Sequence, residues 1–310
     1  MNIVEVKSLY KSYTKSKPTK YAVHNVSLGI EYGEILGLVG ESGCGKSTLG
    51  ALMLKLIEPT KGEIWFDGKN ITNLSFRNMR KIRSQMQIVF QGSSNAFNPY
   101  HTVRQIISEP MDNYTKFSPS EKERNIIASL ESVGLGAEHI ERYSGELSGG
   151  QRQRIGIARA LILEPKFVVC DEAVSSVDYA LKKQILKILY NLKQEKGFTY
   201  LFISHDMAAV NAVCDRVAVM YLGNLVEILP SVNAPALHPY TKALMAATLE
   251  PDPEIKKEKL VLFNESGDFS YPHGGCPFQS RCLQANEKCR TEDQPLREIS
   301  DGHFVACHLI

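Results

Sequence analysis

The sequence lacks any long apolar run and any strong imbalance of charge. No window approaches the roughly 18 apolar residues of a membrane-spanning helix, and residues 1–6 alternate like a strand instead of forming the apolar segment of a signal peptide. Lys and Arg number 36 against 34 Asp and Glu, a net charge of +2, so no basic field favours nucleic acid as a partner. These absences predict a soluble cytosolic protein, which does not exclude peripheral attachment to a membrane complex.

Cysteines in C-x-x-C pairs are absent as well, although the chain has seven cysteines. In a cytosolic protein they are expected as thiols or metal ligands and not as disulfides. Cys44, Cys170 and Cys214 lie within the apolar pattern and are expected to pack in the core. The other four fall within residues 276–310 and are separated by five, six and seventeen residues: Cys276, Cys282, Cys289 and Cys307.

Four cysteines in a short tail rich in proline and glycine suggest a metal, because such a segment is too small to bury much core. Zinc and a [4Fe–4S] cluster both accept four thiolate ligands. Reduced cysteines without a metal are the third alternative, since no spacing rule decides between them.

Residues 40–48 match the phosphate-loop pattern G-x-x-x-x-G-K-[ST] at every fixed position. A predicted buried strand (34–39) precedes them and a predicted helix (49–57) follows, which is the context that the pattern requires. The glycines let backbone N–H groups point at phosphate oxygens, and the helix start adds positive charge. Lys46 supplies an ammonium group for the terminal phosphates, and Ser47 offers a hydroxyl to Mg²⁺. The predicted nucleotide-binding residues are Gly40, Glu41, Ser42, Gly43, Cys44, Gly45, Lys46, Ser47 and Thr48.

A second helix start suited to anions lies ahead of a predicted helix over residues 152–163. Its sequence is Leu147-Ser148-Gly149-Gly150-Gln151. The surrounding segment, about residues 92–160, has little strand character, and this predicts a helical subdomain inserted into the sheet.

Polar side chains follow three predicted buried strands, where α/β sheets place ligand contacts. Gln91 follows the strand 86–90, Asp171 and Glu172 follow the strand 167–170, and His205 follows the strand 198–203. Two carboxylates at a strand end are costly to bury unless they bind a cation or handle a proton. Asp171 is suited to hold Mg²⁺, Glu172 to activate water, and His205 to sense a γ-phosphate.

In this order the segments resemble the ATP-binding subunit of an ABC transporter over residues 1 to about 250. The matching motifs are Walker A (40–47), the Q-loop (Gln91), the signature (147–151), Walker B with the catalytic glutamate (167–172), the D-loop (175–178), the H-loop (His205) and the A-loop aromatic (Tyr13). The resemblance implies an α/β P-loop NTPase fold with an antiparallel β-subdomain and an inserted helical subdomain. It also implies ATP hydrolysis, since no functional position is visibly degenerate.

The resemblance narrows to the oligopeptide/dipeptide importer subfamily, and within it to the F-type subunit. It rests on residues 41–50, 148–161 and 200–206, on the motif 238–244, and on the cysteine-bearing tail. A small Cys-rich C-terminal extension over 251–310 is thereby implied. Some subfamily members carry a [4Fe–4S] cluster there, which favours the cluster over zinc. The ATPase of a nickel or metal-chelate importer remains an alternative, as does a soluble ABC ATPase without a transport role.

The family mechanism implies a role for each residue. Two subunits pair head to tail, and each ATP lies between the phosphate loop of one subunit and the signature of the other. Tyr13 stacks on adenine, and Lys46 and the loop N–H groups hold the β- and γ-phosphates. The implied Mg²⁺ ligands are Ser47, Gln91 and Asp171, the implied catalytic residues are Glu172, His205 and Gln91, and Asp178 closes the D-loop.

The resemblance also implies the partners. They are a second ABC ATPase subunit, of the D-type in a heterodimer, two membrane permease subunits, and an extracytoplasmic solute-binding protein reached through the permeases. The chain would then lie peripherally on the cytoplasmic side of the cell membrane.

Overall fold

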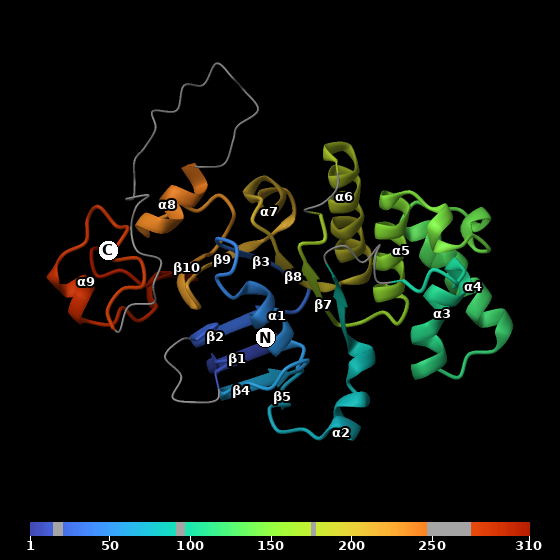
Figure 1. Cartoon of the computed structure of the whole chain (residues 1–310), viewed down its shortest axis with the longest axis horizontal. Helices are drawn as coiled ribbons and strands as arrows, with labels where there is room; N and C mark the ends of the chain where they lie inside the picture. Colours follow the sequence, from blue (N-terminus) through green and yellow to red (C-terminus); the bar gives the residue numbers. More distant parts are fainter. Residues whose placement is uncertain (15–20, 91–96, 175–177, 247–273) are drawn as a thin grey trace, which may run out of the picture. The chain divides into compact units, whose positions relative to one another are not determined.

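The computed structural model describes residues 1–14, 21–90, 97–174, 178–246 and 274–310, in two compact units (Figure 1). The first unit comprises Met1–Val4, Gly29–Ile35 and Trp65–Ile203, and the second comprises Glu5–Leu28, Leu36–Ile64 and Ser204–Ile310. The predicted Q-loop residue Gln91 and the D-loop residues 175–177 lie outside the described residues.

A parallel sheet forms the centre of the first unit. Its neighbouring strands are β6 (Met86–Val89), β7 (Phe167–Asp171) and β8 (Thr199–Ile203), with Met86 opposite Phe167 and Asp171 opposite Ile203. Their continuous apolar runs suit strands that are covered on both faces. Helix α6 (Tyr179–Lys196) begins where the Asp178 carboxylate accepts the Leu181 N–H at 2.9 Å.

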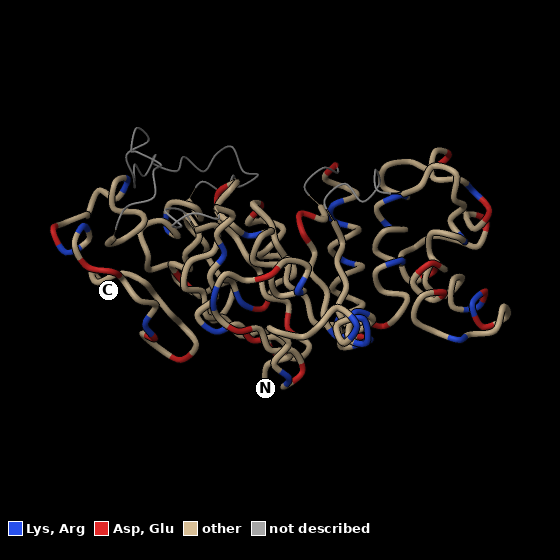
Figure 2. Tube along the Cα trace, turned by 60° about the horizontal axis from the view of Figure 1, so that its bottom comes forward, with Lys and Arg blue, Asp and Glu red and all other residues tan. Residues whose placement is uncertain are grey.

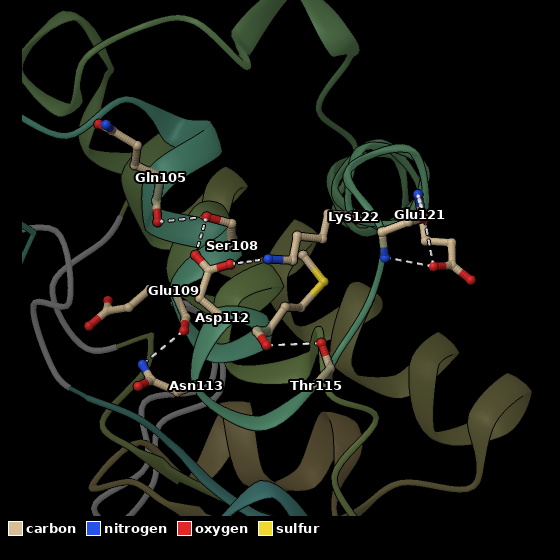
Figure 3. A network of polar contacts seen from close by, with 10 residues as sticks. Gln105, Ser108, Glu109, Asp112, Asn113, Thr115, Glu121 and Lys122 are labelled. Carbon is tan, nitrogen blue, oxygen red and sulfur yellow. Dashed lines mark hydrogen bonds and ion pairs between the residues drawn. The ribbon is translucent and has the colours of Figure 1, made fainter.

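Helices α3 (Val103–Tyr114), α4 (Pro119–Ser132) and α5 (Gly149–Leu161) pack together in the same unit, where the sequence predicts a helical segment. Basic and acidic residues both occur along this part of the trace (Figure 2). Asp112 on α3 accepts a hydrogen bond from Ser108 at 3.2 Å and pairs with Lys122 on α4 (Figure 3). This pair ties the two helices at their exposed faces. Short helical turns precede β6 at α2 (Phe76–Arg80) and at Arg83–Gln85.

The second unit contains a mixed sheet in the order β11-β12-β10-β9-β3. The strands are β3 (Ile35–Val39), β9 (Arg216–Tyr221), β10 (Asn224–Leu229), β11 (Arg297–Ser300) and β12 (His303–Val305). Strand β9 is parallel to β3 and antiparallel to β10, and β12 from the tail pairs antiparallel with β10. Segments far apart in the sequence are thus hydrogen-bonded into one sheet.

Helices α1 (Lys46–Met53), α7 (Met207–Val213), α8 (Pro239–Ala246) and α9 (Glu287–Thr291) belong to the second unit. Helix α1 is shorter than the predicted 49–57, because Lys55 adopts a left-handed φ of 53° and its N–H bonds to the Leu52 carbonyl. The Glu227 carboxylate on β10 is fully buried and accepts the N–H groups of Leu237 and His238, which lead into α8. His303 on β12 bonds to the same carboxylate at 2.8 Å.

Antiparallel strands β2 (Val23–Glu31), β1 (Asn2–Lys11) and β4 (Lys61–Phe66) lie side by side in that order, and β4 is followed by its partner β5 (Lys69–Asn70). Burial alternates along β2 from Val26 to Glu31, as the period-two pattern predicts, whereas in β1 the adjacent residues Ile3 and Val4 are both buried and Lys7 and Ser8 are both exposed. Within the described ranges, no helix is long and apolar enough to cross a membrane.

Candidate functional site

The phosphate loop is held by its glycines in a conformation that other residues would resist. Gly40, Gly43 and Gly45 have φ values of 151°, 77° and 109°. A Cβ on Gly45 would lie 2.0 Å from the carbonyl oxygen of Ala22, and one on Gly40 would lie 2.1 Å from that of Met220. The loop is therefore pressed against two neighbouring backbone segments. Gly45 precedes α1 without a side-chain cap, and a helix start of this kind is suited to an anion.

Lys46 turns back over this loop. Its side chain is 5% exposed, and Nζ donates to the carbonyl oxygens of Gly40 at 2.8 Å and Glu41 at 2.9 Å. Cys44 Sγ lies 3.8 Å from the same nitrogen. Burial raises the pKa of the Cys44 thiol despite the neighbouring ammonium, so the sulfur stays neutral beside Lys46.

Tyr13 lies next to the start of α1. Its ring is 66% exposed, its hydroxyl is 3.4 Å from Thr48 Oγ1, and Lys11 Nζ lies 5.2 Å from the ring centroid. An exposed aromatic face beside a phosphate loop is available for stacking on a base. His205, the predicted phosphate sensor, is exposed and follows Ser204, whose N–H donates to the Leu38 carbonyl at 3.2 Å. The second unit thus contains Tyr13, the phosphate loop and His205.

The predicted carboxylate pair occupies the end of β7 in the first unit. Asp171 is the last residue of the strand, and Glu172 follows with a left-handed φ of 48°. Its N–H donates to the Ile203 carbonyl at 3.0 Å. A left-handed glutamate costs about 1–3 kcal/mol, and such strain concentrates at functional sites. Because of this turn, the Glu172 side chain does not continue the alternation of side chains along β7.

The predicted signature begins α5, also in the first unit. Ser148 is the N-cap, and its hydroxyl accepts the Gln151 N–H at 3.2 Å while the Gln151 side chain accepts the Ser148 N–H at 2.9 Å. This capping box holds the turn through Gly149 and Gly150 in place. A Cβ on Gly150 would meet Leu181 of α6 at 2.4 Å, so this glycine allows a close contact between two helices.

Two residues that the sequence prediction missed support this region. His139 is 8% exposed, its Nδ1 lies 3.2 Å from the Gly136 carbonyl, and its Nε2 lies 3.1 Å from Gln151 Nε2. This pattern places the ring proton on Nδ1 and makes Nε2 the acceptor for the Gln151 amide. Gln153 on α5 is 3% exposed and donates to the Ala173 carbonyl at 2.8 Å, just after Glu172. Only the i, i+3 spacing of Ser148 and Gln151 could have been read from the sequence.

The four tail cysteines line a single pocket in the second unit. It is lined by His238, Pro239, Cys276, Phe278, Gln279, Cys282, Cys289, Gln294, Cys307, His308 and Leu309. Burial raises the pKa of the Cys276 thiol to about 12. Backbone N–H groups donate to the thiol sulfurs, as from Asn286 to Cys289 at 3.4 Å. In the part of the chain that the structure describes, no three His, Cys, Asp or Glu side chains converge closely enough to hold one metal ion.

The remaining three cysteines, which the sequence predicts to pack in the core, behave as expected. Cys44, Cys170 and Cys214 are buried, and burial raises the pKa of the Cys170 thiol to about 12. They act as small apolar residues in the packing.

Comparisons with known proteins agree with these motifs. A family model described as ABC transporter matches residues 23–175, and one described as oligopeptide/dipeptide transporter, C-terminal region, matches residues 223–289. A Brucella ovis protein, whose name marks it as a candidate peptide import ATP-binding protein, is 44% identical over 307 residues, or 98% of this chain and 97% of that protein. The oligopeptide transport ATP-binding protein AppF of Bacillus subtilis is 42% identical over 93% of this chain and 89% of its own.

Among solved structures, the chain is similar to the dimeric ATP-binding cassette MJ0796 in a post-hydrolysis state bound to ADP and Pi. The match has 29% sequence identity and a TM-score of 0.66, and it covers 72% of this chain and 96% of that cassette. The relatives match over nearly the whole chain, and the solved cassette matches over 72% of it. The chain belongs to the ATPase subunits of ABC transporters, and among them to those that carry the oligopeptide/dipeptide transporter C-terminal region.

Proposed function

We propose that this chain hydrolyses ATP to drive the uptake of dipeptides or oligopeptides through membrane permease subunits. Relatives with peptide-transport names match over nearly its whole length, and the C-terminal region of such transporters matches residues 223–289. The observation that carries the proposal is the presence of two helix starts suited to phosphate, one ahead of α1 and one capped by Ser148 ahead of α5.

ATP is held chiefly by the second unit in this proposal. Tyr13 stacks on adenine, and Lys46 and the N–H groups of the loop bind the β- and γ-phosphates. The exposure of the Tyr13 ring beside Thr48 and the glycine-dependent shape of the loop support these roles. Ser47, Asp171 and Gln91 supply the hard oxygen ligands that Mg²⁺ prefers.

Hydrolysis depends on Glu172, which polarises the attacking water, and on His205, which contacts the γ-phosphate. The strained backbone of Glu172 and the Gln153 hydrogen bond just beyond it support a fixed orientation for this carboxylate. Asp178, the last residue of the D-loop, caps α6.

We also propose that two ATPase subunits pair head to tail around ATP, with the Ser148 helix start of each facing the phosphate loop of the other. The similarity to a cassette solved as a dimer with ADP and Pi supports this arrangement. The second subunit is a D-type homologue. The pair lies on the cytoplasmic face of the membrane under two permeases, which receive solute from an extracytoplasmic binding protein.

We also propose that the cysteine pocket holds a [4Fe–4S] cluster. Four thiols line it, backbone N–H groups already point at sulfur, and Pro239, Phe278 and Leu309 make much of the wall apolar. Zinc and a [4Fe–4S] cluster both accept four thiolate ligands, and the resemblance to subfamily members that carry a cluster favours the cluster. The bound group would hold the tail together and supply a one-electron redox centre.

Metal analysis tests this assignment. Protein purified without oxygen should be brown and contain iron and acid-labile sulfide in equal amounts, and Cys276→Ser should lose both. A colourless protein that contains equimolar zinc would show that the pocket binds zinc and not a cluster.

Transport is tested with the chain assembled with its permeases in proteoliposomes. We expect ATP hydrolysis to be stimulated by a peptide-loaded binding protein. Stimulation by a nickel-loaded protein instead would identify a metal importer, and failure to bind any permease in membrane pull-downs would identify an ABC ATPase without a transport role.

A further inference from the structure

A buried arginine of the tail contacts the phosphate loop. Arg281 is 5% exposed, and its Nη1 lies 2.9 Å from both carboxylate oxygens of Glu41, the second residue of the loop. The same nitrogen lies 3.3 Å from the Tyr221 hydroxyl, and the guanidinium lies 5.7 Å from the ring centroids of Tyr221 and Phe278. An ion pair with one partner buried and fixed by rings is stronger than a pair on an open surface.

Glu41 is held at its backbone as well. Its N–H donates to the hydroxyl of Tyr240 on α8 at 2.9 Å, and Tyr240 is 2% exposed. The rings of Tyr221, Tyr240 and Phe278 pack on one another with centroids 4.6–5.4 Å apart. The Tyr240 N–H in turn bonds to His238 Nδ1 at 3.1 Å. Both ends of Glu41 are therefore fixed by residues that lie about 200 positions or more further along the chain.

Glu41 passes this constraint to the reactive part of the loop. Its carbonyl oxygen accepts the Lys46 ammonium at 2.9 Å and the Cys44 N–H at 3.3 Å. Tyr240 holds the N–H group of Glu41, and this contact helps to fix the carbonyl group of the same residue. Movement of Glu41 would therefore shift Lys46 and the turn that presents N–H groups to phosphate.

Arg281 lies on the same turn as Phe278 and Cys282, two residues that line the cysteine pocket. It lies between Cys276 and Cys282 on a turn in which the Phe278 carbonyl accepts the N–H groups of Arg281 at 3.1 Å and Cys282 at 3.0 Å. The arginine is thus positioned by the same turn that carries two of the four thiols. Arg281 thereby connects the tail to the phosphate loop.

We propose that Arg281 and Tyr240 are positioning residues for the phosphate loop, so that the C-terminal extension sets the affinity for ATP by fixing Glu41. This inference rests on the proposed role of the loop in ATP binding. The extension then acts on ATP binding from inside the same subunit, in addition to any part it has in holding a metal.

Fluorescence titration of the full chain with a labelled ATP tests the proposal. Arg281→Met should weaken ATP binding by about tenfold, because hydrogen bonds to charged groups are the strong ones. Arg281→Lys should recover part of this loss, since it keeps one charged donor. Tyr240→Phe should weaken binding by about threefold. Arg290→Met, which changes an exposed arginine of the same tail, is the control and should bind like the unchanged chain.

A double-mutant cycle decides whether Arg281 acts through Glu41. Glu41→Gln should weaken ATP binding, and adding Arg281→Met should weaken it no further, because both changes remove one interaction. Additive losses would overturn the positioning role. Glu41 is half-exposed, so this variant folds even if the arginine variant does not, and normal affinity in it would also overturn the role.

Lys46→Ala separates this proposal from the one on which it rests. Loss of ATP binding in Lys46→Ala with unchanged affinity in Arg281→Met would overturn the positioning role alone. Unchanged affinity in both would overturn the ATP site itself. In the assembled transporter, Arg281→Met should raise KM for ATP and leave kcat within about twofold, a split that a loss of folded protein would not produce.

Discussion

The two helix starts of this chain are suited to the same anion but are stabilised in different ways. At Ser148 the turn is held by its own neighbour, because the side chains and backbones of Ser148 and Gln151 satisfy each other. At Gly45 no side chain caps the helix, and the loop is held by distant backbone and by Arg281 and Tyr240. The helix start at Ser148 is stabilised by residues close in sequence, whereas the helix start at Gly45 is stabilised by residues distant in sequence.

This difference indicates how the work is divided. The start of α1 has no side-chain cap, and the Lys46 ammonium lies against the phosphate loop, which is the arrangement of a binding site. The start of α5 uses its hydroxyl to hold its own turn and presents a small, fixed surface. We expect changes in the second unit to alter ATP affinity, and changes in the first unit to alter hydrolysis while affinity for ATP is kept.

The largest effect is expected at Lys46. Lys46→Ala should weaken ATP binding at least about 100-fold, because it removes the ammonium that compensates phosphate charge in a buried loop. Calorimetry on the full chain measures this, with exposed Lys61→Ala in the same unit as the control. Unchanged affinity for ATP would contradict the proposed ATP site and, with it, the comparison of the two helix starts.

Glu172→Gln should reduce ATP hydrolysis by about 10²–10⁴-fold, the usual contribution of a general base, and leave ATP affinity unchanged. With its partner subunit present, the variant should accumulate as an ATP-bound dimer in size-exclusion chromatography. Ordinary turnover would show that another group activates the water.

Ser148→Ala sharpens the comparison, because the same unit offers a matched control. Ser118 caps α4 with Glu121 through the same kind of box, so both substitutions to alanine should cost about 1 kcal/mol of stability. Only Ser148→Ala should also lower hydrolysis by the assembled dimer, and neither should change ATP binding to the single chain. Equal hydrolysis in the two variants would show that Ser148 acts only as a helix cap.

The smallest effect is expected at His139, whose Nε2 accepts a hydrogen bond from the Gln151 side chain. His139→Ala should lower hydrolysis by about threefold through the loss of one hydrogen bond worth about 0.5–1.5 kcal/mol. ATP affinity should stay unchanged in titrations of the same preparation. A loss of affinity would mean that the two helix starts are not independent.

Sequence patterns predicted the local features well. The phosphate-loop glycines, the Ser148 cap, and the strands before Asp171 and His205 all depend on neighbours within a few residues, so their spacing is sufficient. The end of α1 was predicted four residues late, since nothing in the pattern announces the left-handed turn at Lys55.

Contacts between distant segments were not predictable in this way. Arg281 and Glu41 are 240 positions apart, and an arginine in a cysteine-rich tail carries no signal of its target. His139 and Gln153 likewise act through hydrogen bonds to a side chain and a carbonyl that only the fold brings near. The four cysteines were grouped correctly, but the shape of their pocket depends on His238 and Pro239 from another helix.

The pairing of β12 with β10 has a consequence of its own. Strand β10 is almost wholly buried, whereas the outermost strand β11 is exposed along its length and begins with Arg297 and Glu298. A chain shortened before the tail would present the bare hydrogen-bonding margin of β10 to solvent, and open margins of that kind recruit strands from other molecules. The last residues therefore also protect the molecule from aggregation.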